Sequence, residues 1–182
     1  MNSIKRRLLP FTLTFVIIFL DQITKFIIES TLKINEVGLQ LLWGFIRILH
    51  DKNLGVALGI GRNLPYIIRL LFFSLFPLTI LGFAAYYVFN SEKVTNLQRW
   101  AIAGAIGGGI GNIIDRIFRP EGVVDFISIK LYNLFGLSHF PTFNIADSSL
   151  TICASLFFIS FIINEKMKQK KSSRIAENEI DN

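Results

Sequence analysis

Four long apolar segments dominate the pattern of hydrophobic and polar positions along the chain. They cover about residues 8–28, 64–89, 97–118 and 143–163. Each has the roughly 20 mostly apolar residues that a helix needs to cross a bilayer. We therefore predict an all-α membrane protein with four transmembrane helices in a single domain over residues 1–165. The charged segment that follows, residues 166–182, predicts a disordered tail.

The two long connections between these segments have patterns of their own. Residues 37–49 are rich in Val, Leu, Ile, Trp and Phe with partial alternation, which indicates short strands lying on the membrane surface, with Trp43 as an interfacial anchor. Asn53 and Gly55 follow this segment. Gly55 allows a tight turn, and Asn53 with Gly55 can orient a peptide backbone. Residues 128–140 mix apolar and polar positions and are interpreted as a short interfacial helix. The predicted fold therefore adds a small β-rich platform and a short outer helix to the four spans.

Composition supports a membrane protein over a soluble one. Hydrophobic residues make up 52% of the 182 positions and charged residues only 18%, against about 25% charged in soluble domains. The net charge of +6 comes from basic residues collected near the termini, which favours contact with a membrane surface over nucleic acid. Cys153 is the single cysteine and is interpreted as a buried apolar residue. One cysteine and two histidines far apart in sequence argue against a zinc hydrolase. No metal and no cofactor are predicted.

The basic residues also orient the predicted spans. They precede the first span, occupy the short connection between the second and third, and follow the fourth. These positions are Lys5, Arg6, Arg7, Lys93, Arg99, Lys166, Lys168, Lys170, Lys171 and Arg174. By the positive-inside rule these regions, both termini included, are cytoplasmic. The first segment resembles a signal peptide but lacks a small-x-small cleavage site after it, so we interpret it as a retained span.

With this topology, the ionisable residues in the apolar segments lie at the outer ends of their spans, apart from Arg99 at the inner end of the third. Asp21 and Lys25 close the first segment, Asp115 and Arg116 close the third, and Asp147 opens the fourth. Charges in hydrocarbon cost about 2.5–3.5 kcal/mol each on insertion scales, which makes such residues candidates for a functional site. Polar neighbours extend this outer-leaflet set: Asn53, Gly55, Asn112, Asp125 and Asn144.

Asp125 and Asp147 are the candidates for chemistry. Two carboxylates in close approach share one proton, so one can act as base on a water and the other as acid on a substrate carbonyl. Which of the two is the base is left open. Taken alone, Asp125 also fits an ordinary loop acid, and Asn144 fits a helix N-cap that Asp147 complements. The sequence holds no Ser–His–Asp set at useful positions.

The remaining candidates have structural alternatives. Asp21 and Lys25 lie four residues apart, so they form either a self-neutralising intrahelical pair or a support for the site. Asp115 and Arg116 are either a structural interface pair or, through Arg116, a means of holding a carboxylate. The glycines between residues 103 and 111 fit close helix packing and need no other role. We expect the four charged residues, Asp21, Lys25, Asp115 and Arg116, to support the structure of the site rather than to react.

Five sequence blocks together resemble the lipoprotein signal peptidase family, signal peptidase II. They are Asp-Gln-Ile-Thr-Lys at 21–25, Asn-Leu-Gly-Val-Ala-Leu-Gly at 53–59, Gly-Asn-Ile-Ile-Asp-Arg at 111–116, Val-Val-Asp-Phe-Ile at 123–127 and Phe-Asn-Ile-Ala-Asp-Ser at 143–148. Their order and spacing match the family from about residue 8 to residue 165. One departure is that Val56 and Leu58 stand where the family usually has Ala and Phe.

The resemblance implies an intramembrane aspartic endopeptidase of the bacterial inner membrane, which removes the signal peptide of prolipoproteins just before a diacylglyceryl-modified cysteine. It implies Asp125 and Asp147 as the catalytic acids. It assigns site or supporting roles to Asp21, Lys25, Asn53, Asn112, Arg116 and Asn144. The implied partners are lipidated prolipoproteins and membrane lipid, with globomycin-type cyclic peptides as inhibitors.

Two other functions stay open on the sequence. A small ion-coupled transporter also uses acids within its spans, but its site usually lies near the bilayer midplane, often between internal repeats. A structural assembly subunit would use the polar residues only to hold helices together. The crowding of polar groups at one edge, without a repeat, argues against the transporter, and the family resemblance favours the peptidase over both alternatives.

Overall fold

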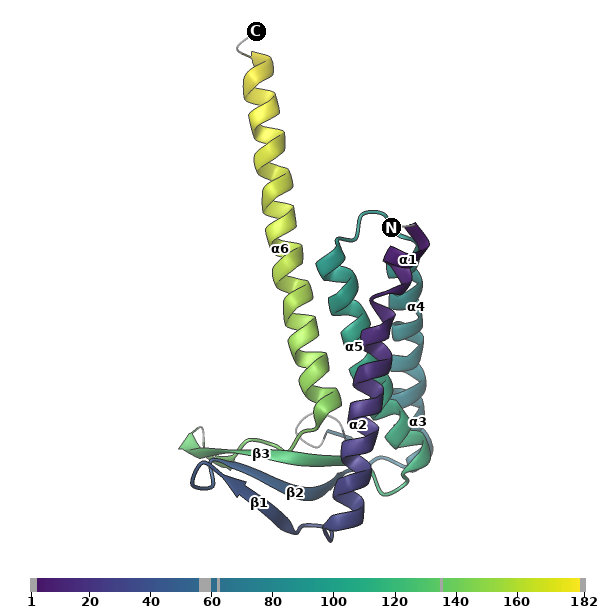
Figure 1. The fold of residues 1–182 in the computed structure, drawn as a ribbon, viewed down its shortest axis with the longest axis vertical. Helices are drawn as coiled ribbons and strands as arrows, with labels where there is room; N and C mark the ends of the chain where they lie inside the picture. The colour runs from purple at the N-terminus through teal and green to yellow at the C-terminus, as the bar shows by residue number, and fades with distance from the viewer. Residues whose placement is uncertain (1–2, 56–59, 62, 135, 181–182) are drawn as a thin grey trace.

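The computed structural model describes residues 3–55, 60–61, 63–134 and 136–180 (Figure 1). The helices are α1 Ser3–Leu8, α2 Phe11–Thr31, α3 Tyr66–Leu70, α4 Phe76–Asn90, α5 Asn96–Phe118 and α6 Ile145–Ile180, with a π-helical turn η2 at Leu71–Leu75. The strands are β1 Val37–Leu41, β2 Ile46–Asn53, β3 Val123–Leu134 and β4 Leu137–His139. The long helices form a bundle and the sheet lies across one end of it, which we call the sheet end (Figure 1).

Among the described residues, four helical stretches are long and apolar enough to cross a membrane, which confirms the four predicted spans. They are Ile4–Thr31, Tyr66–Asn90, Asn96–Phe118 and Ile145–Lys170. Large apolar side chains cover the outside of the bundle: Phe15, Phe19 and Phe83 are 72%, 67% and 70% exposed. Such a surface suits lipid, where helices satisfy their own backbone hydrogen bonds and apolar side chains meet apolar chains.

Helix α6 continues to Ile180, beyond the predicted end of the fourth span. The composition after residue 166 predicts a disordered tail, whereas the structure continues the helix through this segment. Its Lys, Gln and Glu residues are good helix formers, and Lys168 pairs with Glu165 one turn away at 2.6 Å. This part of α6 extends past the other helices (Figure 1), so local propensity rather than packing accounts for it. The domain boundary at residue 165 stays a prediction.

The sheet is antiparallel with strand order β1-β2-β3-β4. Strands β1 and β2 confirm the strands predicted within residues 37–49. The helix predicted at 128–140 is wrong, because the segment is occupied mainly by β3 and β4. Ile127, Ile129 and Leu131 are each followed by a more polar residue, and this two-residue period is that of a strand with one apolar face.

Helix α5 lies between α2 and α6 and has small residues on both contact faces. A Cβ added at Gly107 would lie 3.0 Å from the carbonyl oxygen of Thr14 in α2. A Cβ added at Gly108 would collide with the carbonyl oxygen of Ala146 in α6. The glycines therefore bring both neighbouring helices close to α5, as the packing interpretation expects. The first turn of α6, which carries Asp147, is held against α5 by this contact.

We expect Gly108→Ala to destabilise the protein by about 1–3 kcal/mol, because the new methyl group must push α6 away from α5. The matched control is Gly82→Ala in α4, where an added Cβ meets nothing within 4 Å. Thermal unfolding of the purified variants in detergent measures both effects. Equal unfolding temperatures for the two variants would contradict the close packing of α5 on α6.

Candidate active site

Asp125 lies on β3 at the sheet end, with 1% of its surface exposed. Its Oδ1 accepts a hydrogen bond from Asn144 Nδ2 at 2.7 Å, and its Oδ2 accepts one from Asn53 Nδ2 at 3.0 Å. Asn53 is the last residue of the neighbouring strand β2. Its Oδ1 accepts a hydrogen bond from the backbone N–H of Gly55 at 3.0 Å. Both oxygens of the carboxylate are therefore held by amides from two different parts of the chain.

Asp147 lies in the first turn of α6 and is held in a similar way. Its Oδ1 accepts a hydrogen bond from Asn112 Nδ2 at 2.7 Å, and its Oδ2 accepts the backbone N–H of Asn144 at 3.2 Å. Asn144 Oδ1 accepts the backbone N–H of Asp147 at 2.9 Å. This reciprocal pair is an N-terminal helix cap. The cap proposed as an alternative for Asn144 is thus present, and it is part of the site.

Asn144 is the residue that joins the two acids. It is fully buried, its side-chain amide donates to Asp125, and its backbone amide donates to Asp147. Burial first, and the nearby negative charge of Asp147 second, raise the pKa of Asp125 to about 7, against the hydrogen bonds from Asn53 and Asn144 that lower it. A carboxylic acid that keeps its proton near neutral pH, next to a second carboxylate, can exchange protons with a substrate.

Beneath this pair lies a fully buried charged cluster on α2 and α5. Lys25 Nζ contacts Asp21 Oδ2 at 2.7 Å and Asp115 Oδ2 at 2.8 Å, and the three side chains have no exposed surface. Lys25 also donates to Asn112 Oδ1 at 3.0 Å, and Asn112 holds Asp147. Asp21 Oδ1 accepts the backbone N–H of Ala146 at 3.0 Å. The predicted pair of Asp21 and Lys25 is present, and it connects α2 to the first turn of α6.

Of the two alternatives for Asp115 and Arg116, the ion pairs of Asp115 do not include Arg116. Asp115 pairs instead with Lys25 and, through Oδ1, with Arg119 at 2.5 Å. Successive residues on a helix point in different directions, whereas residues four apart share a face, and Arg119 is four residues after Asp115. Asp115 Oδ2 also accepts the backbone N–H of Val124 at 3.2 Å, which ties α5 to the start of β3.

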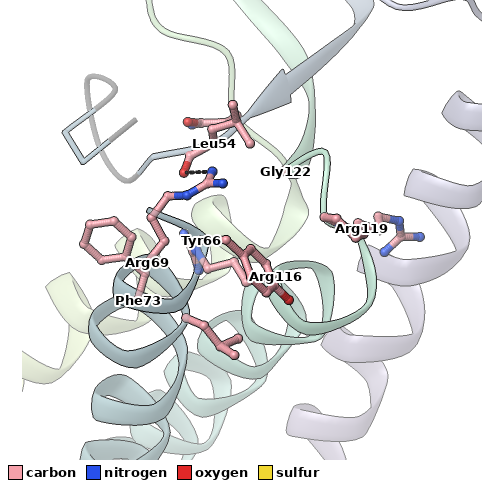
Figure 2. A pocket seen from close by; sticks show the side chains of 10 residues that line it. Leu54, Tyr66, Arg69, Phe73, Arg116, Arg119 and Gly122 are labelled. Carbon is pink, nitrogen blue, oxygen red and sulfur yellow. Dashed lines mark hydrogen bonds between the residues drawn. The ribbon is translucent and has the colours of Figure 1, made fainter. Parts of the chain in front are cut away.

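Arg116 lines a small cavity at the sheet end (Figure 2). The cavity is also lined by Asn53, Tyr66, Arg69 and Phe73. Figure 2 shows Arg69 donating to the carbonyl oxygen of Leu54, at 3.1 Å. Within the described part of the chain, Arg116 has no ion-pair partner within 4.0 Å.

Sequence reasoning missed several charged and polar residues around the site. They are Gln22, Glu29, Lys52, Arg69 and Arg119. The spacing of Asp115 and Arg119 could have indicated one of these contacts. The others join segments that are far apart in sequence, so no local pattern marks them. The unusual Val56 and Leu58 lie outside the described residues.

A family model described as Signal peptidase (SPase) II matches residues 13–163. A lipoprotein signal peptidase of Treponema pallidum (strain Nichols) is 40% identical over 162 residues, which cover 89% of this chain and 87% of the relative. The chain belongs to the signal peptidase II family. A lipoprotein signal peptidase of Borrelia hermsii (strain HS1 / DAH) is 38% identical over 160 residues, covering 87% of this chain and 93% of the relative.

Two solved structures, each described as a bacterial membrane enzyme, share the fold of this signal peptidase II. One has a TM-score of 0.73 and 32% sequence identity, and the match covers 87% of this chain and 90% of the other. The second has a TM-score of 0.69 and 34% identity, covering 84% and 91%. Family membership makes the chain a peptidase with membrane-spanning helices, and it leaves the ion-coupled transporter unsupported.

Proposed function

We propose that this signal peptidase II removes the signal peptide from prolipoproteins as an aspartic endopeptidase, with Asp125 and Asp147 as its catalytic pair. The observation that carries the proposal is the position of Asn144, which hydrogen-bonds both carboxylates from one fully buried residue. The charge of Asp147 contributes to raising the pKa of Asp125 to about 7, so the two acids can divide the roles of proton donor and base between them.

In the proposed mechanism the resting pair has its proton on Asp125, while Asp147 is ionised. Asp147 takes a proton from a water as the water oxygen bonds to the scissile carbonyl carbon, and Asp125 gives its proton to the carbonyl oxygen. The tetrahedral intermediate collapses when Asp147 protonates the leaving nitrogen and Asp125 recovers a proton from the hydroxyl. The C–N bond breaks, the carbonyl forms again, and the pair returns to its starting state.

The other predicted site residues have supporting roles in this proposal. Asn53, Asn112 and Asn144 donate to the two carboxylates and hold them in place. The buried cluster of Asp21, Lys25 and Asp115 fixes α2 and α5 beneath them. Gly55 orients Asn53 through its backbone N–H, and Arg116 faces the cavity, where it can bind a substrate carbonyl.

The membrane placement follows from the basic residues. Helix α1, which carries Lys5, Arg6 and Arg7, lies at the end of the bundle opposite the sheet (Figure 1), and by the positive-inside rule this supports a cytoplasmic position for that end in a bacterial inner membrane. The sheet end and the catalytic pair then lie at the outer leaflet. The substrate's signal helix would lie among the four spans, with its diacylglyceryl-modified cysteine at this level and its acyl chains in lipid. Globomycin-type cyclic peptides would compete for the same site.

A dependence on pH follows from the pair. Because Asp125 must be protonated to donate, and its pKa is raised to about 7, we expect the cleavage rate to fall as the pH rises through about 7. The measurement is kcat against pH for a lipidated prolipoprotein peptide. A rate that keeps rising from neutral to alkaline pH would contradict this protonation state.

The cellular activity is tested by complementation. A bacterial strain depleted of its own lipoprotein signal peptidase accumulates uncut prolipoprotein, and expression of this chain should restore processing. The transporter alternative predicts instead proton-coupled flux in proteoliposomes and no processing. Persistent uncut prolipoprotein, with the chain present in the membrane at normal levels, would contradict the proposed function.

A further inference from the structure

A second charged cluster lies at the sheet end, outside the catalytic pair and the buried cluster beneath it. Its centre is Glu29, in the last turn of α2. Glu29 Oε1 contacts Lys52 Nζ at 2.5 Å, and Glu29 Oε2 accepts from Arg119 Nε at 2.9 Å. One carboxylate therefore binds two cations from two different segments, one from β2 and one from the end of α5.

Lys52 and Arg119 lie on the two segments that position Asp125. Lys52 directly precedes Asn53, and the pairing of β2 with β3 sets Lys52 opposite Val124 and Asn53 opposite Val123. Arg119 begins the short turn from α5 into β3. At the end of that turn Gly122 has φ +115°, and a Cβ there would lie 2.7 Å from the carbonyl oxygen of Asn53. The turn and the end of β2 are thus in direct contact beside the site.

We propose that Glu29 is a positioning residue, which binds Lys52 and Arg119 so that Asn53 stays against Asp125. The inference rests on the proposed function, because the effect it predicts is measured on catalysis. Glu29 touches neither carboxylate of the pair. It acts on the ends of β2 and β3, and these two strand ends hold the hydrogen bond of 3.0 Å between Asn53 Nδ2 and Asp125 Oδ2.

Burial distinguishes this cluster from ordinary surface ion pairs, which contribute little because water screens them. The side chains of Lys52, Arg119 and Glu29 are only 11%, 18% and 27% exposed. Glu121 offers an internal comparison, because it lies 4.0 Å from the same lysine but is 72% exposed. Arg119 also contacts Asp115, so the cluster around Glu29 is continuous with the buried cluster beneath the pair.

The test compares Glu29→Gln with the matched control Glu121→Gln in the full-length protein, using a lipidated prolipoprotein peptide. We expect Glu29→Gln to lower kcat about tenfold with KM unchanged, because small displacements of catalytic groups cost much of the rate. The alkaline limb of the pH profile should move to higher pH, since the Asn53 hydrogen bond lowers the pKa of Asp125 and would be weakened. Glu121→Gln should leave kcat and the pH profile unchanged.

A double-mutant comparison separates positioning from general stability. Lys52→Met should reproduce the loss in kcat. The double variant with Glu29→Gln should be no slower than the slower single variant, because both changes break the same contact between Glu29 and Lys52. Unchanged kcat and pH profile in Glu29→Gln would overturn the inference. So would a lower kcat with a lower unfolding temperature but an unmoved alkaline limb, since that is a structural effect only. If the unsubstituted protein leaves the peptide uncut, it is the proposed function that fails.

Discussion

Asp125→Asn and Asp147→Asn are each expected to lose cleavage by about 10²–10⁴-fold, the contribution of a positioned acid or base. An amide has nearly the shape of the carboxylate but neither gives nor takes a proton in this reaction. The rates of the purified variants on a lipidated prolipoprotein measure the loss. Folding should be largely kept, although the new amide meets the donors that now hold the carboxylate. For Asp125 these donors are the side chains of Asn53 and Asn144.

Asp51→Asn is the matched control for this pair of variants. Asp51 lies opposite Asp125 in the pairing of β2 with β3, and its Oδ2 accepts a hydrogen bond from Thr142 Oγ1 at 2.6 Å. It is a carboxylate in the same part of the sheet, and among the described residues it has no hydrogen bond to Asp125 or Asp147. We expect it to keep the rate of the unsubstituted protein. Full activity in Asp125→Asn or Asp147→Asn would exclude that residue from the chemistry.

Lys25→Met is expected to destabilise the protein by about 3–5 kcal/mol, the cost of breaking a buried ion pair by removing one partner. Lys25 is the cation between Asp21 and Asp115, and all three side chains are fully buried. Without it, two buried carboxylates remain in the bundle, and among the residues that the structure describes only Arg119 pairs with one of them. Unfolding in denaturant or on heating, in detergent, measures the loss.

The control for Lys25→Met is Lys168→Met in the C-terminal part of α6. Lys168 also pairs with an acid on its own helix, but its side chain is 69% exposed and that of Glu165 is 44% exposed. Removing an exposed pair of this kind costs less than about 1 kcal/mol. An unfolding curve of Lys25→Met that matches the curve of this control would show that the buried cluster does not hold the bundle together.

Hydrophobic length was enough to predict the four spans, because a bilayer requires about 20 apolar residues in each. It was not enough for residues 128–140. That segment is polar on one side and apolar on the other, as an interfacial helix would be, and the error came from judging its composition rather than its two-residue period. β3 runs without interruption from Val123 to Leu134, so the segment that carries Asp125 is a strand of the sheet.

The site shows the same division between local and distant contacts. Asp21 with Lys25, and Asn144 with Asp147, were predictable because each pair is three or four residues apart on one helix. The same spacing of four residues could have indicated Arg119 as a partner of Asp115. The contacts of Glu29 instead depend on where the α5–β3 turn lies in space. The bridge that Asn144 forms between two acids depends on packing α6 against the sheet, which no spacing along the chain records.

The most direct test of the catalytic assignment is the mass of the product. The purified protein is incubated with a prolipoprotein that has a diacylglyceryl-modified cysteine, and the new N-terminus is identified by mass spectrometry. We predict a mature fragment that begins with the modified cysteine, produced by the unsubstituted protein and absent with Asp125→Asn and Asp147→Asn. A fragment cut at another bond, or the same fragment from either variant at the unsubstituted rate, would contradict the account.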